Sequence, residues 1–215
     1  AAQALGIHSV RFLGYRDSGM AGTAENNNPG ALHNAAADEV VRQIVTLMRE
    51  IQPQVVITFD PEGGYGHPDH IAIHQHTVAA FHAAGDAERY PDTGLPWQPT
   101  RLFYSVNPRS VFRAMRDKMA AAGADTRQFD QFEEQGLGWP DDQIEAELDV
   151  SSTVGAKWAA INAHHTQFGP NSPFFQFPEA EVKQLMSREY FALAWPQLQP
   201  GAQLTDLFQD IPDAE

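Results

Sequence analysis

The sequence predicts an α/β fold in which a mostly parallel sheet is flanked by helices. Apolar residues recur at helical spacing in some segments and form short continuous runs in others, and the two kinds of segment alternate along the chain. The run from Val55 to Phe59 is apolar on both faces, which is typical of a central strand in a parallel sheet. These two patterns together define the predicted class.

The composition narrows the class of protein further. A length of 215 residues with 42% hydrophobic content is enough for one sizeable core. The formal net charge of -14 argues against a protein that binds nucleic acid through its phosphates. No apolar run approaches the roughly 20 residues of a membrane span, and no signal-peptide pattern is present. We therefore expect a cytoplasmic protein that handles small molecules, with no membrane or nucleic-acid partner.

Cysteine is absent, which restricts the metal chemistry open to the chain. Disulfides and thiolate ligands are excluded. Any transition metal must be held by histidine and carboxylate side chains.

Two helices are predicted with clear ends. Apolar residues recur at helical spacing from Asp38 to Ile51, with acidic residues at the start and Arg49 at the end to complement the helix dipole. Pro68 suits the first turn of a second helix that continues to about Ala84. The remaining predictions are strands at 9–13, 101–106 and 187–193, the last at a sheet edge; helices at 111–122, 151–165 and 179–186; a flexible surface loop at 23–37; and an acidic, irregular insertion or lid at 125–150.

The segment after the strand at 55–59 is the most informative for function. A loop with three glycines leads into His67-Pro68-Asp69-His70 at the predicted helix start. Ligands of open α/β sheets bind just past the carboxyl ends of strands. Two imidazoles and a carboxylate in one small volume suit zinc. The second histidine could then act as a proton donor, with Asp69 fixing its tautomer. The alternative is a histidine-rich helix cap in which Asp69 binds backbone amides.

Further histidines lie on the same predicted helix. His70 and His74 are four residues apart, so they share a helix face and could chelate a metal. His76 and His82 lie on the same predicted helix. The interpretation that we favour is a solvated polar face with one ligand at its N-terminal end.

Four other residues are candidates, each with a structural alternative. Tyr65 lies between glycines and could polarise a substrate carbonyl, or it could pack the loop. Arg16 and Asp17 follow a predicted strand and could bind a polyol, or they could form a local ion pair. His164 closes a predicted helix, where an imidazole eases the helix dipole. The aromatic residues Phe174, Phe175 and Phe177 are expected in a core or pocket wall.

The run from Gly63 to His70, with its preceding strand, resembles the LmbE-like, or PIG-L, de-N-acetylases, and within them the mycothiol branch. Segments 12–22, 164–167, 189–194 and 205–208 agree with the same family in order. The resemblance implies a Rossmann-like α/β sandwich. It also implies hydrolysis of an N-acyl amide on a glucosamine-containing small molecule, with one zinc ion, or ferrous iron, as the cofactor.

The resemblance also implies a role for each residue of the motif. His70 is the zinc ligand. His67 stabilises the tetrahedral intermediate or protonates the departing amine, and Asp69 orients His67. Tyr65 is a mobile tyrosine over the scissile carbonyl.

Three residues outside that motif are implied on the substrate side. Asp17 contacts sugar hydroxyls, with Arg16 beside it. His164 matches a histidine near the pocket.

One family motif, Ala-His-Pro-Asp-Asp-Glu, is not in this chain. In the family it supplies two zinc ligands and the general base. We expect residues 1–215 to form a single LmbE-like domain whose N-terminal part precedes Ala1. We accordingly expect enzyme activity of the intact protein and little activity of these residues alone.

Other functions stay open at this point. The same chemistry could act on a bacillithiol precursor, a chitin-derived sugar or an antibiotic intermediate. A degenerate site in a non-catalytic binding module is a second alternative, and a homo-oligomer is compatible with the sequence. A dinucleotide-binding oxidoreductase is disfavoured, because no Gly-x-Gly-x-x-Gly pattern follows a strand and opens a helix.

Overall fold

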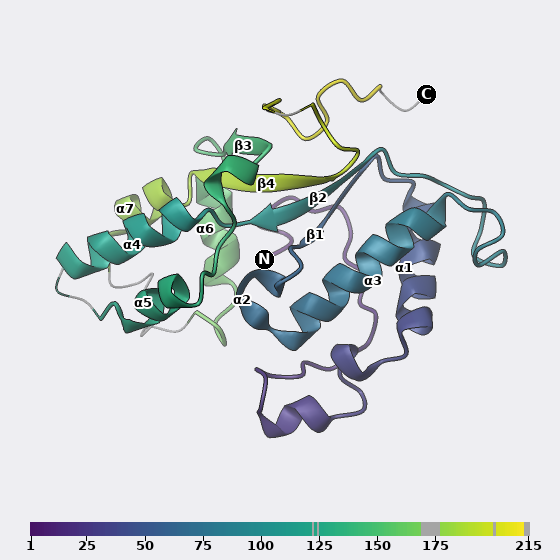
Figure 1. Ribbon diagram of the computed structural model, residues 1–215, viewed down its shortest axis with the longest axis horizontal. Coiled ribbons are helices and arrows are strands. Elements are labelled where there is room, and N and C mark those ends of the chain that lie inside the picture. Colours follow the sequence, from purple (N-terminus) through teal and green to yellow (C-terminus); the bar gives the residue numbers. More distant parts are fainter. Residues whose placement is uncertain (122, 124, 169–176, 200, 213–215) are drawn as a thin grey trace. The chain divides into compact units, whose positions relative to one another are not determined.

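The predicted α/β class is confirmed by a computed structural model, which describes residues 1–121, 123, 125–168, 177–199 and 201–212 (Figure 1). The chain divides into two compact units. One comprises Ala1–Phe12 with Glu147–Glu189, and the other comprises Leu13–Ala146 with Tyr190–Glu215. The sequence indicates one domain over residues 1–215, and this stays a prediction.

A four-stranded mixed sheet has the order β1-β2-β4-β3. The strands are β1 (Val55–Phe59), β2 (Arg101–Val106), β3 (Ala146–Asp149) and β4 (Arg188–Trp195). β1 pairs in parallel with β2, from Val55 opposite Arg101 to Phe59 opposite Ser105. β4 runs antiparallel to β2.

The predicted positions of two strands in the sheet are wrong. Among the described strands, β1 lies at an end of the sheet, and β4 lies between β2 and β3 instead of at an edge. The reason is that a central position depends on which distant segments pair with the strand, which local composition does not record. The apolar run of β1 does not guarantee burial either. On β1, Ile57 is 47% exposed.

The two helices with clear predicted ends are confirmed. They are α1 (Ala37–Ile51) and α3 (Pro68–Ala84), which lie side by side in Figure 1. Their apolar faces form a core with β2, in which Phe81 is 0% and Leu102 is 1% exposed. This packing fixes the position of the N-terminal turn of α3, where the predicted site lies.

The other helices are α2 (Gly63–Gly66), α4 (Arg109–Ala121), α5 (Arg127–Glu134), α6 (Val154–Asn162) and α7 (Glu179–Leu185), with short 3-10 turns at Ala24–Asn27, Leu32–Asn34 and Asp141–Gln143. Of these helices, α4, α6 and α7 differ from the sequence predictions only at their ends, whereas α2 and α5 are not predicted. The segment 125–150 is not irregular, because it holds α5, a 3-10 turn and β3. Its role as an insertion or lid stays a prediction.

The predicted strand at 9–13 is wrong. The structure assigns no strand to these residues, and Phe12 is 90% exposed. An apolar segment becomes a strand only where a neighbouring backbone completes its hydrogen bonds.

In the described part of the chain, no helix is both long and apolar enough to span a bilayer.

Candidate active site

The loop between β1 and α3 contains a tight turn that is closed by hydrogen bonds to Asp60. The Asp60 carbonyl accepts the Gly63 amide at 2.9 Å, and its Oδ1 accepts the Gly64 amide at 2.9 Å. Gly63 has φ +64, and a Cβ there would lie 2.8 Å from the backbone nitrogen of Ile71. The loop therefore needs glycine at this position to approach the first turn of α3.

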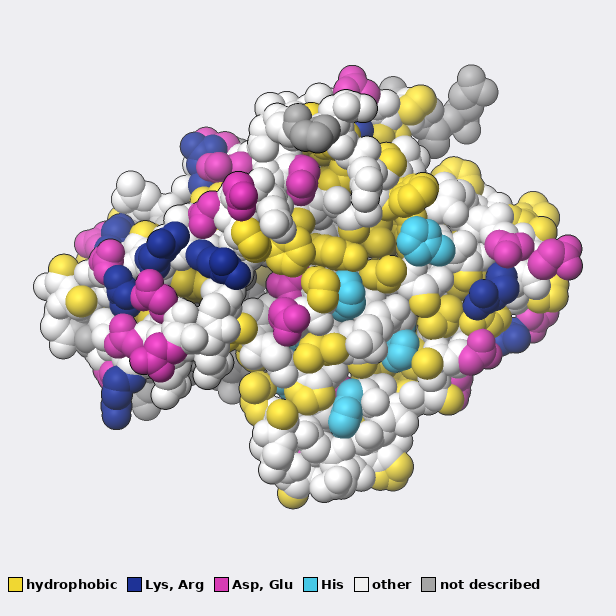
Figure 2. Space-filling model, in the orientation of Figure 1, with side chains coloured by type: hydrophobic (Ala, Val, Ile, Leu, Met, Phe, Trp, Pro, Cys, Tyr) yellow, Lys and Arg dark blue, Asp and Glu magenta, His cyan; other side chains and the backbone are white. Residues whose placement is uncertain are grey.

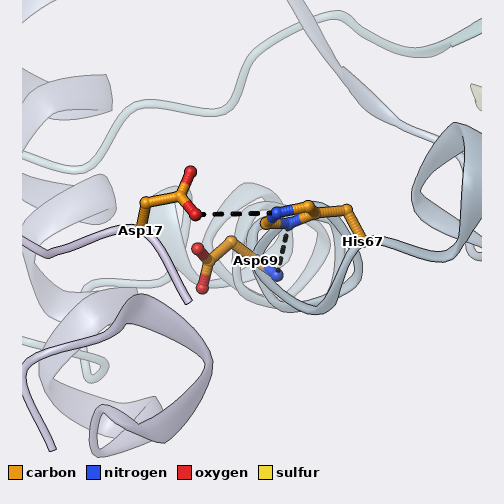
Figure 3. A group of neighbouring side chains, drawn as sticks. All are labelled: Asp17, His67 and Asp69. Carbon is orange, nitrogen blue, oxygen red and sulfur yellow. Dashed lines mark hydrogen bonds and ion pairs between the residues drawn. The ribbon is translucent and has the colours of Figure 1, made fainter. Parts of the chain in front are cut away.

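His67 is the N-cap of α3 and is 8% exposed. Its Nδ1 accepts the Asp69 amide at 3.3 Å, so the neutral ring carries its proton on Nε2. Nε2 lies 3.8 Å from Oδ1 of Asp17 (Figure 3). The sequence motif thus presents a proton donor toward a carboxylate from a segment 50 residues away in the chain.

Asp69 holds a distant loop through its carboxylate. Oδ2 accepts the Ser18 amide at 2.8 Å, and Oδ1 accepts the His33 amide at 3.0 Å. The alternative interpretation, in which Asp69 binds backbone amides, describes this geometry. It is the amide of Asp69, and not its carboxylate, that bonds the His67 ring.

The segment from Arg16 to Asn34 is held by its own hydrogen bonds. Asn26 Nδ2 donates to the Ser18 carbonyl at 2.6 Å, and the Asn26 carbonyl bonds His33 Nε2 at 2.9 Å. The backbone of Arg16 pairs with that of Ala31. Sequence reasoning missed Ser18, Asn26 and His33. The only signal was the run of asparagines, whose side chains commonly bind nearby backbone in turns.

His70 lies beside His67, with 4.7 Å between the ring centroids. Its Nδ1 bonds the Gly63 carbonyl at 3.1 Å, and its ring stacks on Phe59 at 4.0 Å. Because a carbonyl only accepts, Nδ1 carries the proton and Nε2 keeps a lone pair. This arrangement is common for metal-binding histidines. Burial lowers the pKa of His70, which favours the neutral ring that a metal ligand must be.

Tyr65 contacts both histidine rings of this cluster and is 49% exposed. Its ring forms T-shaped contacts with the rings of His70 and His67, with 5.2 Å and 6.2 Å between the ring centroids. Burial, followed by the charge of Asp17, raises the pKa of Tyr65. The phenol therefore keeps its proton at neutral pH.

The next histidine on α3, His74, packs within the fold and not in the site. His74 is buried, with Nδ1 bonded to the Phe59 carbonyl at 2.8 Å and its ring edge on Tyr104 at 4.9 Å. The predicted solvated face is wrong for His74, which is buried. His76 on the same helix is buried as well, and His82 is exposed. Periodicity could not reveal this, because α3 is covered on several sides.

One group of possible metal ligands gathers among the described residues. Donor atoms of Asp17, His67 and Asp69 all lie within 4.8 Å of one another (Figure 3). His70 is outside that group, although its ring contacts His67. Imidazole and carboxylate donors of this kind suit a divalent transition metal.

The other predicted site residues are not members of this group. Arg16 is exposed next to Asp17. His164 is exposed after α6 and belongs to the other compact unit, so its substrate role stays a prediction. Phe177 is partly buried, while Phe174 and Phe175 lie outside the described residues.

Comparison with known proteins defines the class. The profile of the family PIG-L, GlcNAc-PI de-N-acetylase, matches residues 1–81. The crystal structure of the conserved protein TT1542 from Thermus thermophilus has a TM-score of 0.53 and 20% identity, covering 94% of this chain and 74% of that one. At this identity, the likeness shows the fold alone.

Curated relatives are more similar in sequence. A 1D-myo-inositol 2-acetamido-2-deoxy-alpha-D-glucopyranoside deacetylase of Streptomyces scabiei is 37% identical over 99% of this chain and 68% of its own length. A protein of the same name from Geodermatophilus obscurus is 39% identical over 90% of this chain and 68% of its own length. The chain belongs to the PIG-L family of hydrolytic de-N-acetylases. The resemblance found in the sequence is thus confirmed, and the family together with the Asp17–His67–Asp69 group indicates a metal ion.

Proposed function

We propose that this chain takes part in the metal-dependent hydrolysis of the N-acetyl group of an N-acetylglucosaminyl-inositol. The observation that carries the proposal is the pair of neighbouring imidazoles, His67 and His70, on the first turn of α3 with Asp17 beside them. The names of the relatives at 37% and 39% identity supply the substrate.

Zinc is the proposed metal, with ferrous iron as the alternative. His70 is the proposed ligand although it lies outside the Asp17–His67–Asp69 group, because the Asp69 carboxylate already accepts two backbone amides and His67 Nδ1 accepts the Asp69 amide. The bond from its Nδ1 to the Gly63 carbonyl supports this choice, since it leaves Nε2 as the donor atom. The nitrogen and oxygen donors nearby suit either ion. When bound, the metal would polarise the acyl carbonyl and lower the pKa of a coordinated water.

His67 is the proposed acid of the reaction. Its Nε2 proton is free to be donated to the developing oxyanion or to the departing amine, because Nδ1 is already occupied by the Asp69 amide. The Tyr65 hydroxyl, protonated at neutral pH, would donate to the same oxygen. We assign no general base among the described residues.

Asp17 is the proposed contact for sugar hydroxyls. Its side chain is 77% exposed, and its Oδ1 accepts the Gly19 amide at 2.7 Å, which holds the carboxylate in place. Asp69 would position it by holding Ser18 and His33. Arg16 and His164 are proposed on the substrate side with it.

Metal binding is the first test. In the intact protein, titration with zinc should give one site per chain, and His70→Ala should weaken it at least about 100-fold. His82→Ala is the matched control, because His82 is an exposed histidine on the same helix. Equal zinc affinity of the two variants would remove His70 from the site.

Acetate release is the second test. With N-acetylglucosaminyl-inositol as substrate, acetate release by the metal-loaded intact protein should fall about 100-fold or more in His67→Ala. The panel should include N-acetylglucosamine, a chitin-derived disaccharide and the bacillithiol precursor. Tight substrate binding by the intact protein without release from any of them would favour a binding module.

A further inference from the structure

A cavity lies between α4, α5 and the turn that follows α5. Its volume is about 470 Å³, and its lining residues all fall between Arg109 and Asp142. None of them belongs to the candidate active site. A volume in this range is typical of small-molecule sites.

One wall of the cavity is basic. Arg109, Arg113 and Arg116 recur at positions i, i+4 and i+7 of α4, so they share one helix face. The facing wall is acidic and carries Glu133, Asp141 and Asp142. Figure 2 shows basic side chains interleaved with acidic ones over the region that Figure 1 labels α4 and α5.

The cavity also has an aromatic side. Phe112 and Phe129 line it, with 6.5 Å between their ring centroids, and both rings contact Phe132. A Cβ on Gly138 would lie 2.9 Å from the Phe112 ring, so the absence of a side chain lets the turn close against the aromatic group. An apolar group of a ligand could rest on this surface.

The charged groups differ in how fully they are engaged. Arg116 is bonded to Asp117 and paired with Glu133, and Arg109 donates to the carbonyls of Gly138 and Gly136. Arg113, in contrast, forms a single long ion pair, with 3.7 Å between its guanidinium and the Asp141 carboxylate, and its side chain is 53% exposed.

Asp142 is the least engaged carboxylate of the opposite wall. Within the described chain it makes no hydrogen bond or ion pair, and it is exposed. Arg113 and Asp142 are therefore the cation and the anion of the cavity that are most available to a ligand.

We propose that this cavity binds a zwitterionic α-amino acid with an apolar side chain. The carboxylate would pair with Arg113, the ammonium group with Asp142, and the side chain would pack on Phe112 and Phe129. The lining carries as many carboxylates as guanidinium groups, which disfavours a ligand of single charge sign. A dipolar ligand matches both walls at once.

The test uses three probes that differ by one charge. They are L-phenylalanine, 3-phenylpropionate, which lacks the ammonium group, and phenethylamine, which lacks the carboxylate. Binding to the full chain is measured by calorimetry and by ligand-observed NMR. L-Phenylalanine should bind at least about tenfold more tightly than either analogue, as expected for one charge-assisted contact.

Two variants cross-check the assignment of the walls. Arg113→Gln should lower the affinity for L-phenylalanine and 3-phenylpropionate about tenfold and leave the affinity for phenethylamine unchanged. Asp142→Asn should lower the affinity for L-phenylalanine and phenethylamine and leave the affinity for 3-phenylpropionate unchanged. Arg127→Gln is the control, since Arg127 is 86% exposed on α5 and outside the lining. Far-UV circular dichroism confirms folding of each variant.

Three results would overturn the proposal. They are equal affinity for all three probes, an effect of Arg113→Gln no larger than that of Arg127→Gln, and no saturable binding of L-phenylalanine at about 10 mM. None of these measurements depends on deacetylation, so this proposal and the proposed function fail independently.

Discussion

Gly63→Ala tests whether the loop before α3 depends on a close backbone approach. The new Cβ would lie 2.8 Å from both the Ile71 nitrogen and the His70 Cβ. Neither atom can swing away, because the first is helix backbone and the second is fixed to it. The loop or the first turn of α3 must therefore shift.

Two contributions make up the expected loss of stability. Alanine at φ +64 costs about 1–2 kcal/mol in the left-handed region. The overlap with α3 adds about 1–3 kcal/mol, as for an extra methyl group in a packed site. The free energy of unfolding should therefore fall by roughly 2–5 kcal/mol.

Gly66→Ala is the matched control. Gly66 has φ +84 but nothing within 4 Å of its added Cβ, so only the backbone contribution of about 1–2 kcal/mol applies. Urea unfolding of both variants, compared at equal m-value, isolates the overlap. Zinc affinity should also fall in Gly63→Ala, since the Gly63 carbonyl orients His70.

A difference of less than about 0.5 kcal/mol between the two variants would refute this reasoning. It would mean that the loop relaxes without strain. The approach of Gly63 to α3 would then not be what positions His70.

Three further changes have expected outcomes. Arg49 is 5% exposed and donates to several carbonyls around the turn after α3, so Arg49→Met should lower the free energy of unfolding by about 3 kcal/mol or more. Arg42 is half-buried and pairs with Asp92 at the surface, so Arg42→Met should lower the free energy of unfolding far less in the same urea experiment. Burial lowers the pKa of His76, so the unfolded chain takes up more protons as pH falls below about 6.5. Stability should therefore be full above that pH and decline below it; His76→Gln should flatten the decline between about pH 7 and pH 5, and His82→Gln should not. Asp69→Ala frees the two loop amides that its carboxylate accepts, so hydrogen exchange should accelerate at both while α1 stays protected; unchanged exchange would show that the loop is held by other contacts.

The local features of this protein follow from the sequence by itself. α1 and α3 are predicted with ends within a residue of those observed, because helical periodicity and Pro68 are properties of neighbouring residues. The loop-to-helix motif from Gly63 to His70 is recognisable for the same reason. Its functional groups are contiguous in the chain, so no long-range contact is needed to bring them together.

The tertiary structure alone decides how that motif is completed. The bonds from Ser18 and His33 to Asp69 join residues 51 and 36 positions apart, and they bring Asp17 to His67. Strand order and the burial of His74 are decided in the same way. A hydrogen bond or a packed contact between distant segments depends on the whole folded chain, so local periodicity cannot predict it.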